Sequence, residues 1–536
     1  MHRIGLIVIL VLAAFLLFYK LDQYPRGIHI DEVRVGNTAW SILKTGKDFY
    51  GNTLPLYFNS FGDYRPMGLM YLTVPFLWLG GLSIWTTRLP GAIAALISIF
   101  VFFILLRSFF PKGITAIGAT TVFVLSPWLL ILGRSTSESL PALALVLFGL
   151  WCWVKGREGK NGKMLIVGTA AFITSFFFYH SPRVFVPLVI LYFPFTAWHF
   201  FRGQFRHFLF HWIVITLASL SLIFLVPGGA GRFHQTSLLS DPEIVKHVTS
   251  LTEDEGPGRV LQARTLHNKG VVVSQKFLSN YFRYFSYEFL FGDGGKPLRY
   301  SVGDVGMLSI PVLPFLLVGL RMFMRSKSWR WFTLWWLITA PIAAAATFDF
   351  QPNVQRSIFL LPVFAMLAGI GMEEAWKLVG IKYRVVFVGV MIASTIGWSY
   401  FAVHQYAVHM TGIQKNERDV NLTILASFIH KQTEYDRIVM ASSPIPSYEH
   451  VLFETGFNPL LVQESGDIRE TIQWQYGRYT FVRDHCPSAR TVVNLQEKTL
   501  FIDSAICDPT VSTRDIGVLG DTPIDTYYRL RVPKAQ

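Results

Sequence analysis

Residues 88–108, RLPGAIAALISIFVFFILLRS, are apolar throughout except near the two ends, where Arg88 and Arg107 stand. A helix of roughly 20 mostly apolar residues crosses the hydrocarbon core of a bilayer. Similar stretches recur along the chain and predict a polytopic α-helical membrane protein with about 11 transmembrane helices. The expected spans are 4–19, 88–108, 114–131, 139–155, 164–178, 183–200, 208–226, 306–324, 331–347, 356–370 and 384–402.

The composition excludes several other classes of protein. Of the 536 residues 52% are hydrophobic and 15% are charged, whereas an average soluble domain carries roughly 25% charged residues. Three cysteines are too few for a disulfide-stapled secreted scaffold, and the apolar content excludes a disordered chain. Most of the chain is therefore expected to form membrane helices rather than a series of soluble domains.

A further apolar stretch, 67–83, is expected not to span the membrane. It contains Pro75 and the pair Gly80-Gly81, and the next span begins at Arg88, shortly after it ends. We interpret it as an interfacial or re-entrant segment, so that the whole of loop 20–87 stays on one side of the membrane.

The net charge of +14 follows from where the basic residues lie. Lys and Arg gather in five short connections between the expected spans: 107–112, 155–163, 202–206, 321–330 and 377–384. Because cytoplasmic loops of membrane proteins are rich in Lys and Arg, these connections and the N-terminus are expected inside a plasma (inner) membrane. Loops 20–87 and 227–305 and the tail 403–536 are then exterior or periplasmic. The remaining charge is nearly balanced and gives no support to nucleic-acid binding.

The tail 403–536 differs in composition from the rest of the chain. Short β-like runs begin at Arg437, Tyr479 and Leu500, and 419–431 has a helical pattern. The sequence thus predicts two domains, a transmembrane domain over 1–402 and a small exterior α/β domain over 403–536. An oxidising exterior would allow Cys486 and Cys507 of the tail to pair, although the sequence does not establish the geometry.

The strongest chemical feature is the carboxylate pair Asp31-Glu32 in the first exterior loop. Apolar and polar residues after it follow helical spacing, which places Asp31 near a helix N-terminus. There an anion is favoured by the helix dipole, so Asp31 could be a structural cap. The functional alternative is a general base or charge stabiliser at the membrane surface.

Basic and acidic side chains at the exterior ends of other spans are further candidates. Arg65, close to Asp63, could interact with lipid headgroups or bind phosphate through its guanidinium. Arg134 and Glu138 would share a helix face if their turn is helical, as a salt bridge or as part of a cleft. The remaining candidates are His180, Arg183, Arg283, Arg299 and Arg356. The sequence contains no P-loop, GxGxxG, CxxC pair or HExxH motif.

Several motifs occur in a specific order. They are Asp31-Glu32, Gly46-x-Asp48 with Pro55, Arg65-Pro66 before Tyr71-Leu72, Arg88-Leu-Pro-Gly-Ala92, Arg134 with Glu138, and Arg356-Ser-Ile-Phe-Leu-Leu-Pro362. With these motifs, residues 1 to about 370 resemble the GT-C glycosyltransferases that use polyprenyl-phosphate sugars. Within that fold the chain looks like the protein O-mannosyltransferase and lipid A aminoarabinose transferase group.

The resemblance implies roles for individual residues. Asp31, with its neighbour Glu32, would be the catalytic carboxylate, and loops 20–87 and 227–305 would build the active site. Arg65 would contact the donor phosphate, helped by Arg283 or Arg299. The substrate pocket would contain Asp63, Arg134, Glu138, His180, Arg183 and Arg356. Two positions depart from the family pattern: Tyr64 stands where the aminoarabinose transferases have Glu, and Gln355 where His is common. No metal ligand set is therefore assigned, and a divalent cation is left open.

The expected function is transfer of a sugar from a polyprenyl-phosphate donor to an acceptor hydroxyl on the exterior face, with inversion. The acceptor could be a glycan, a lipid or a protein. One alternative is a transporter or flippase for the lipid-linked sugar, although its charges would more often lie near the bilayer midplane. A third is a scaffold whose tail binds a partner.

Overall fold

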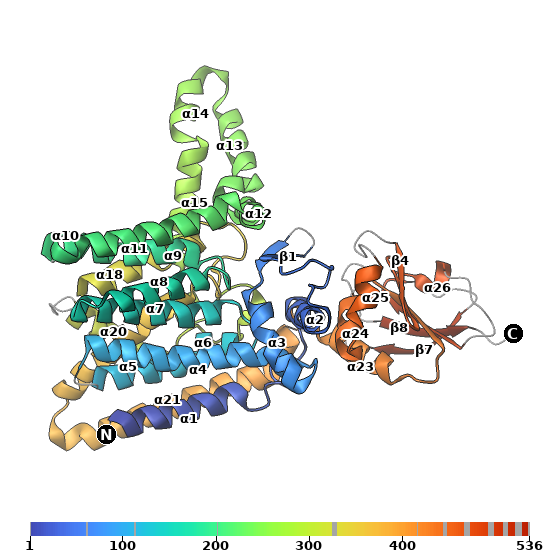
Figure 1. The fold of residues 1–536 in the computed structure, drawn as a ribbon, viewed down its shortest axis with the longest axis horizontal. Helices are drawn as coiled ribbons and strands as arrows, with labels where there is room; N and C mark the ends of the chain where they lie inside the picture. The colour runs from blue at the N-terminus through green and yellow to red at the C-terminus, as the bar shows by residue number, and fades with distance from the viewer. Residues whose placement is uncertain are drawn as a thin grey trace. The chain divides into compact units, whose positions relative to one another are not determined.

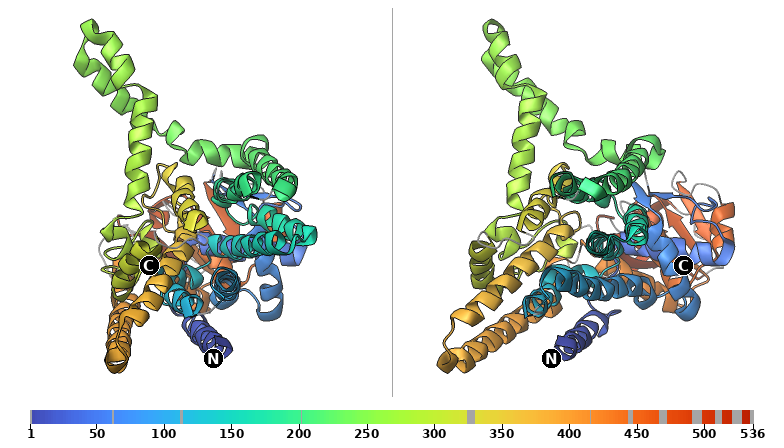
Figure 2. Two further views of the ribbon diagram at one scale, coloured as in Figure 1. Left: turned by 90° about the vertical axis from the view of Figure 1, so that its left-hand side faces the viewer. Right: turned by 60° about the vertical axis from the view of Figure 1, so that its left-hand side comes forward.

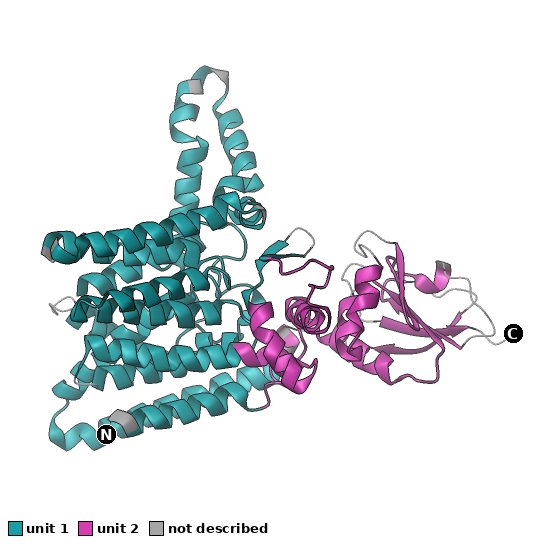
Figure 3. Cartoon of the chain, viewed as in Figure 1, with its two compact units in different colours: residues 1–19, 56–68, 91–410 teal, residues 20–55, 69–90, 411–536 magenta. Residues whose placement is uncertain are grey.

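The computed structural model describes residues 2–536 apart from 61–62, 112–113, 201, 324–329, 415, 443–446, 466–471, 491–497, 508–512, 520–527 and 534–536. Three basic residues of the expected cytoplasmic connections, Lys112, Arg325 and Lys327, lie outside the described residues. The chain forms two compact units, and neither is continuous in sequence (Figure 3). Unit 1 comprises 1–19, 56–68 and 91–410, and unit 2 comprises 20–55, 69–90 and 411–536.

Unit 1 consists mainly of helices (Figure 1). Its first elements are α1 (His2–Phe18), the hairpin β1 (Tyr57–Ser60) and β2 (Asp63–Pro66), and α4 (Ile84–Phe109), whose first turns belong to unit 2. The central helices are α5 (Ile114–Val124), α6 (Pro127–Gly133), α7 (Ser139–Gly159), α8 (Gly162–Ser175), α9 (Pro182–Ile190), α10 (Tyr192–Phe200), α11 (Arg202–Leu220) and α12 (Pro227–Thr236). They are followed by α13 (Pro242–Glu255), α14 (Val260–Leu266), α15 (Lys269–Arg283), α16 (Tyr287–Leu290), α17 (Leu313–Phe323), α18 (Arg330–Thr339), α19 (Ile342–Ala345), α20 (Leu361–Leu378) and α21 (Arg384–His404).

Five helices in the described part of the chain are long and apolar enough to cross a membrane. They are Ile84–Phe109, Ser139–Gly159, Gly203–Leu225, Ile358–Leu378 and Ile381–His409. A sixth span results if α5 and α6, bent by 55° at their junction, are counted as one. The chain is thus a helical membrane protein, but the expected count of about 11 spans is not confirmed.

The difference in count arises where apolar stretches do not form one long helix. The expected span 114–131 bends before Pro127, which lacks the amide hydrogen needed to continue the α5 ladder. The expected span 183–200 is divided between α9 and α10, and 331–347 between α18 and α19. Helix α3 (Gly68–Gly80), in the stretch 67–83, has only 13 residues. At about 1.5 Å per residue it is shorter than a bilayer core, and that the stretch 67–83 does not span stays a prediction.

Close helix packing in unit 1 depends on glycine. Helix α20 lies between α17 and α5, with Gly371 and Gly319 at the contact with α17. A Cβ at Gly371 would collide with the carbonyl of Phe315, and one at Gly319 with the carbonyl of Leu367. Small residues of this kind let membrane helices approach backbone to backbone.

Loop 227–305, which the sequence predicts to be exterior, is helical in part. Helices α13, α14 and α15 extend away from the other helices of unit 1 in both views of Figure 2. Helix α15 buries Val272 and Asn280, whereas Leu278 and Phe282 are exposed. That these helices lie on the membrane surface stays a prediction.

Unit 2 contains α2 (Ile30–Thr45), most of α3 and the α/β tail. The tail has α23 (Val420–Lys431), α24 (Tyr448–Thr455), α25 (Pro459–Glu464) and α26 (Pro487–Arg490). Its six-stranded sheet has the order β4-β5-β3-β6-β8-β7, with β3 parallel to β5 and β6. The strands are β3 (Arg437–Ala441), β4 (Gln473–Tyr476), β5 (Tyr479–Val482), β6 (Thr499–Ser504), β7 (Thr513–Leu519) and β8 (Tyr528–Pro533). The predicted tail strands and the predicted helix at 419–431 are therefore confirmed.

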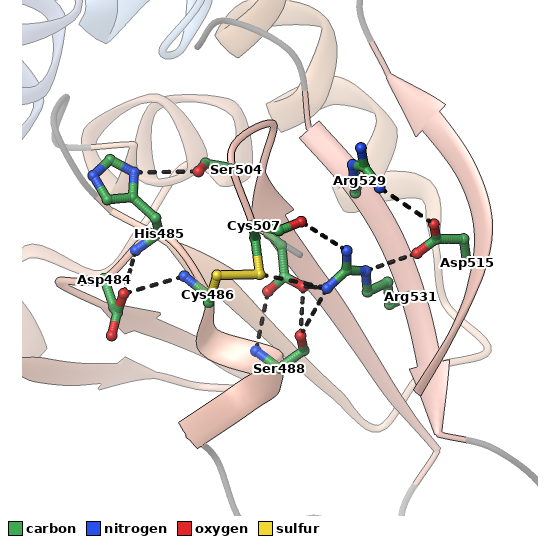
Figure 4. Close-up of a disulfide and its surroundings, with 10 residues drawn as sticks. Asp484, His485, Cys486, Ser488, Ser504, Cys507, Asp515, Arg529 and Arg531 are labelled. Atoms are coloured by element: carbon green, nitrogen blue, oxygen red, sulfur yellow. Dashed lines mark hydrogen bonds and ion pairs between the residues drawn. A yellow bond between two sulfur atoms is a disulfide. The ribbon is translucent and has the colours of Figure 1, made fainter. Parts of the chain in front are cut away.

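A buried polar cluster stabilises this sheet where β5 and β6 end (Figure 4). Cys486 and Cys507 form the disulfide that the sequence left open. Beside it the buried Arg531 pairs with the buried Asp503 at 2.7 Å, and Asp503 also accepts a hydrogen bond from the Ser488 amide at 3.0 Å. The pairing of both charges lowers the cost of removing them from water.

Candidate active site

The carboxylate pair lies in the first turn of α2, as the sequence predicted. This helix belongs to unit 2. His29 is the N-cap residue, and its Nδ1 accepts a hydrogen bond from the Asp31 amide at 3.0 Å. Asp31 Oδ2 lies 3.4 Å from the same Nδ1, and the side chain retains 14% of its exposure. A carboxylate in this position is stabilised by the positive end of the helix dipole.

Glu32 points into a different environment from its neighbour. It is buried between two arginines, with Arg88 Nε 2.8 Å from Oε2 and Arg418 Nη2 2.8 Å from Oε1. Burial would raise the pKa of Glu32, but the charges of Arg88 and Arg418 outweigh it and lower the pKa to about 2. Glu32 is therefore ionised and occupied by ion pairs, which favours a structural role over the catalytic one expected from its position beside Asp31.

Arg88 also organises the loop in front of α2. Its Nη1 donates to the carbonyl oxygens of Leu21 and Pro25, each at 3.0 Å, and its Nη2 donates to that of Gly27 at 2.6 Å. Arg88, the first residue of the Arg88-Leu-Pro-Gly-Ala92 motif, thus holds the loop that leads to Asp31 through three backbone carbonyl groups.

In unit 1, the hairpin β1–β2 presents Asp63 and Arg65 on one strand. Asp63 Oδ2 accepts from Arg65 Nε at 2.9 Å, and Asp63 Oδ1 accepts from Arg232 of α12. Arg65 Nη1 lies 4.0 Å from Glu138 Oε1. Glu138 is buried, whereas Asp63, Arg65 and Arg232 are partly exposed, so the two guanidinium groups form a site that can attract an anion.

Arg232 is a member of loop 227–305 that the sequence reasoning did not select; Arg283 and Arg299 were expected instead. Arg283 is exposed at the end of α15, and Arg299 lies over the Tyr300 ring at 5.1 Å. The sequence did contain one indication of Arg232, namely the glycines Gly228, Gly229 and Gly231 just before it. A Cβ at Gly231 would meet the Tyr64 ring at 3.0 Å, so glycine allows α12 to approach the hairpin.

His180 and Arg183 also contact the hairpin. Arg183 Nη1 donates to His180 Nδ1 at 3.0 Å, which leaves the His180 Nε2 hydrogen to bond the Tyr64 carbonyl at 3.1 Å. Burial and the charge of Arg183 hold the pKa of His180 well below its usual range, so the ring is neutral. The Arg183 guanidinium lies 5.3 Å from the centre of the Tyr57 ring.

Tyr179 adjoins this cluster. Burial raises the pKa of its phenol to about 12, and the charges of Arg356, Glu138 and Arg232 act on it as well. Tyr179 therefore lies among three side chains that come from separate segments of unit 1. Its place in the chain, next to His180, was the only sequence signal for it.

Arg134 and Arg356 make extensive structural contacts. Arg134 donates to the carbonyl oxygens of Leu16 at 2.6 Å and Tyr19 at 2.9 Å, at the end of α1. It follows α6, and Glu138 precedes α7, so the turn between them is not the continuous helix that would place them on one face. Arg356 forms a bidentate pair with Asp349, at 2.6 and 2.7 Å. Across the described residues, no group of three or more His, Cys, Asp or Glu side chains is placed to hold a metal ion.

Two solved structures match nearly the whole chain. Both are of ArnT from Cupriavidus metallidurans, in the apo state and bound to undecaprenyl phosphate. The TM-scores are 0.55 and 0.58, with 13% sequence identity, and each alignment covers 98% of this chain and 97% of ArnT.

The chain has the fold of ArnT. ArnT is a lipid A aminoarabinose transferase with the GT-C fold, so the predicted resemblance is confirmed at the level of the fold. No protein-family model matches the chain, and no curated protein matches it in sequence. At 13% identity, ArnT defines the architecture and leaves donor and acceptor to be inferred from the side chains.

Proposed function

We propose that this protein is an integral-membrane glycosyltransferase that moves a sugar from a polyprenyl-phosphate donor to an acceptor hydroxyl. The observation that carries the proposal is the pair of arginines, Arg65 and Arg232, that flanks Asp63 in a chain with the ArnT fold. Guanidinium groups match phosphate oxygens in charge and in planar geometry. One of the two ArnT structures contains undecaprenyl phosphate, a ligand of this chemical class.

Arg65 and Arg232 hold the donor phosphate in this proposal. Asp63 keeps both guanidinium groups in place, and His180 holds the strand that carries Arg65 through the Tyr64 carbonyl. When the sugar leaves, the two arginines stabilise the charge that develops on the lipid phosphate. Glu138, beside Arg65, contributes to binding the sugar.

The reaction is a single displacement at the anomeric carbon. The acceptor oxygen forms a bond to that carbon while the bond to the phosphate oxygen breaks, and the polyprenyl phosphate leaves with the bonding electron pair. Asp31 takes the proton of the acceptor hydroxyl, and Glu32 stays ionised and keeps α2 in place. One displacement through an oxocarbenium-like transition state inverts the anomeric centre.

We further propose that transfer takes place on the exterior face of the plasma (inner) membrane, with the N-terminus and the basic connections in the cytoplasm. The supporting observations are the distribution of Lys and Arg and the Cys486–Cys507 disulfide, which is typical of an oxidising compartment.

The test uses purified protein and a panel of polyprenyl-phosphate sugars, with candidate glycan, lipid and peptide acceptors. Mass spectrometry should detect an acceptor that has gained one sugar, and NMR of the product should show inversion. The Asp31→Asn variant should lose at least about a hundredfold in kcat, the usual contribution of a general base, while its Tm falls only slightly through the lost interaction with the helix dipole. Movement of intact donor between leaflets without transfer would support the flippase instead.

A further inference from the structure

The segment that leads into α2 is held by side chains of the tail, which lies far away in sequence. Ile28 shows this most clearly because both of its backbone groups are bonded to tail residues. Its amide donates to Thr423 Oγ1 at 3.1 Å, and its carbonyl accepts from His450 Nε2 at 3.0 Å. The backbone just ahead of Asp31 is thus fixed in two directions.

The first turn of α2 is completed by the tail. The Ile30 amide, which has no partner inside the helix, donates to Asp419 Oδ2 at 2.7 Å. A carboxylate at a helix N-terminus is also favoured by the helix dipole. Asp419 therefore acts as a second cap beside the His29 side chain, which accepts from the Asp31 amide.

Side chains of α2 form a second set of contacts with the tail. Arg418 pairs with Glu32 at 2.8 Å, and Glu449 accepts from Arg34 Nε at 3.0 Å and Arg34 Nη2 at 3.1 Å. Asn37 Nδ2 donates to the Glu449 carbonyl at 2.9 Å. The charges are largely buried, so they are screened little by water and fix geometry well.

We propose that the C-terminal domain is the positioning element for the Asp31 carboxylate. Tail residues contact Ile28, Ile30, Glu32, Arg34 and Asn37, positions on both sides of Asp31. Thr423, Asp419 and Arg418 are positioning residues that act through the loop and helix and need not touch substrate. This inference rests on the proposed function and gives residues 411–536 a role in it.

The experiment removes single tail contacts and measures their effect on both activity and the segment itself. Thr423→Val deletes the acceptor for the Ile28 amide, Asp419→Ala deletes the acceptor for the Ile30 amide, and Thr423→Ser keeps the hydroxyl. The matched control is Asp503→Asn, which disturbs the buried pair with Arg531 in the same domain (Figure 4). All variants are made in the full chain and compared for Tm, kcat, donor KM and hydrogen–deuterium exchange over residues 27–37.

Thr423→Val and Asp419→Ala should lower kcat by between about tenfold and a hundredfold, because small displacements of a catalytic group are costly. Donor KM should change little, and exchange over 27–37 should rise. Thr423→Ser, which keeps the hydroxyl, should keep kcat close to the wild-type value. Combined with Asp31→Asn, Thr423→Val should cause little further loss, since its effect passes through Asp31.

The positioning role is overturned if exchange over 27–37 rises while kcat stays at the wild-type value. It is equally overturned if Thr423→Val and Asp419→Ala do not raise exchange over 27–37. The same conclusion follows if the control Asp503→Asn, at an equal loss of Tm, lowers kcat as much as these two variants do. Failure of the proposed function gives a different result: the wild-type chain then transfers no sugar from any donor in the panel. The exchange measurement still decides in that case whether the tail holds residues 27–37.

Discussion

Arg418 Nη2 lies 2.8 Å from Glu32 Oε1, although 386 positions separate the two residues along the chain. Arg88 occupies the other oxygen of the same carboxylate. Glu32 thus joins the loop before α2, the start of α4 and the tail in one buried ion cluster within unit 2.

Glu32→Gln should destabilise the protein by about 3–5 kcal/mol, because it leaves two buried arginines without their counter-charge. The pKa of Glu32 is about 2 in the folded chain against an ordinary value of 4.5. The contribution of the Glu32 charge to the free energy of unfolding is therefore present above pH 4.5 and disappears as the pH falls towards 2. Thermal unfolding in detergent at several pH values checks this. Glu454→Gln, on an exposed position of α24, should change stability little, and an equal loss in both variants would contradict the assignment.

His450 should make stability depend on pH in a milder range. Burial, together with the charge of Arg34, lowers its pKa to about 4 against the opposing hydrogen bond to Ile28. As the pH falls, His450 takes up a proton in the unfolded chain before it does so in the folded chain. Its full contribution to the free energy of unfolding is therefore present above pH 6.5 and falls by about 3 kcal/mol as the pH drops to 4. His450→Gln keeps a donor for the Ile28 carbonyl but does not titrate. The difference in Tm between wild type and variant should therefore shrink with decreasing pH; a constant difference would be evidence against a neutral His450.

Arg232→Ala should raise the donor KM by about 10- to 100-fold, the effect of losing one or two hydrogen bonds to a charged group. Arg232→Lys should recover only part of the loss, since an ammonium cannot bind phosphate in a bidentate way. Initial rates at varied donor concentration measure both. Arg264→Ala, on the exposed surface of α14, is the control and should leave KM unchanged. An Arg232→Ala variant with wild-type KM would remove Arg232 from the donor site.

The Cys486–Cys507 disulfide should be present in native membranes if the tail faces an oxidising compartment. Peptide mapping without reduction should recover the linked peptides, and the double Cys→Ser variant should lose about 3 kcal/mol of stability for a loop of this length. Cys152, which is free and buried, serves as an internal reference for alkylation after denaturation. Alkylation of both tail cysteines in unreduced membranes would place the tail in a reducing compartment.

The features that could be predicted from the sequence are those that depend on local pattern. Apolar runs indicated membrane helices, and short β-like runs at Arg437, Tyr479 and Leu500 indicated strands that the structure confirms. The position of Asp31 at the start of a helix was also predictable, because helical spacing follows it directly.

Features that depend on distant segments could not be predicted in this way. No local pattern distinguishes Glu32 from Asp31, and their different environments arise from Arg88 and Arg418, which come from two other segments. Arg232 likewise gains its significance from Asp63, 169 positions away. The number of spans could not be read from apolar length, because the break before Pro127 depends on how the helices pack and end.

The discontinuity of unit 2 also has a consequence for synthesis on the ribosome. Residues 20–55 emerge early, but Arg418 follows Glu32 by 386 residues. At roughly 5–20 residues per second, the delay is about 20–80 seconds. During that interval the nascent chain carries the Glu32 carboxylate without Arg418. Completion of unit 2 must therefore await synthesis of residues 411–536, and a ribosome that stops before residue 411 leaves the loop without the tail residues that hold it.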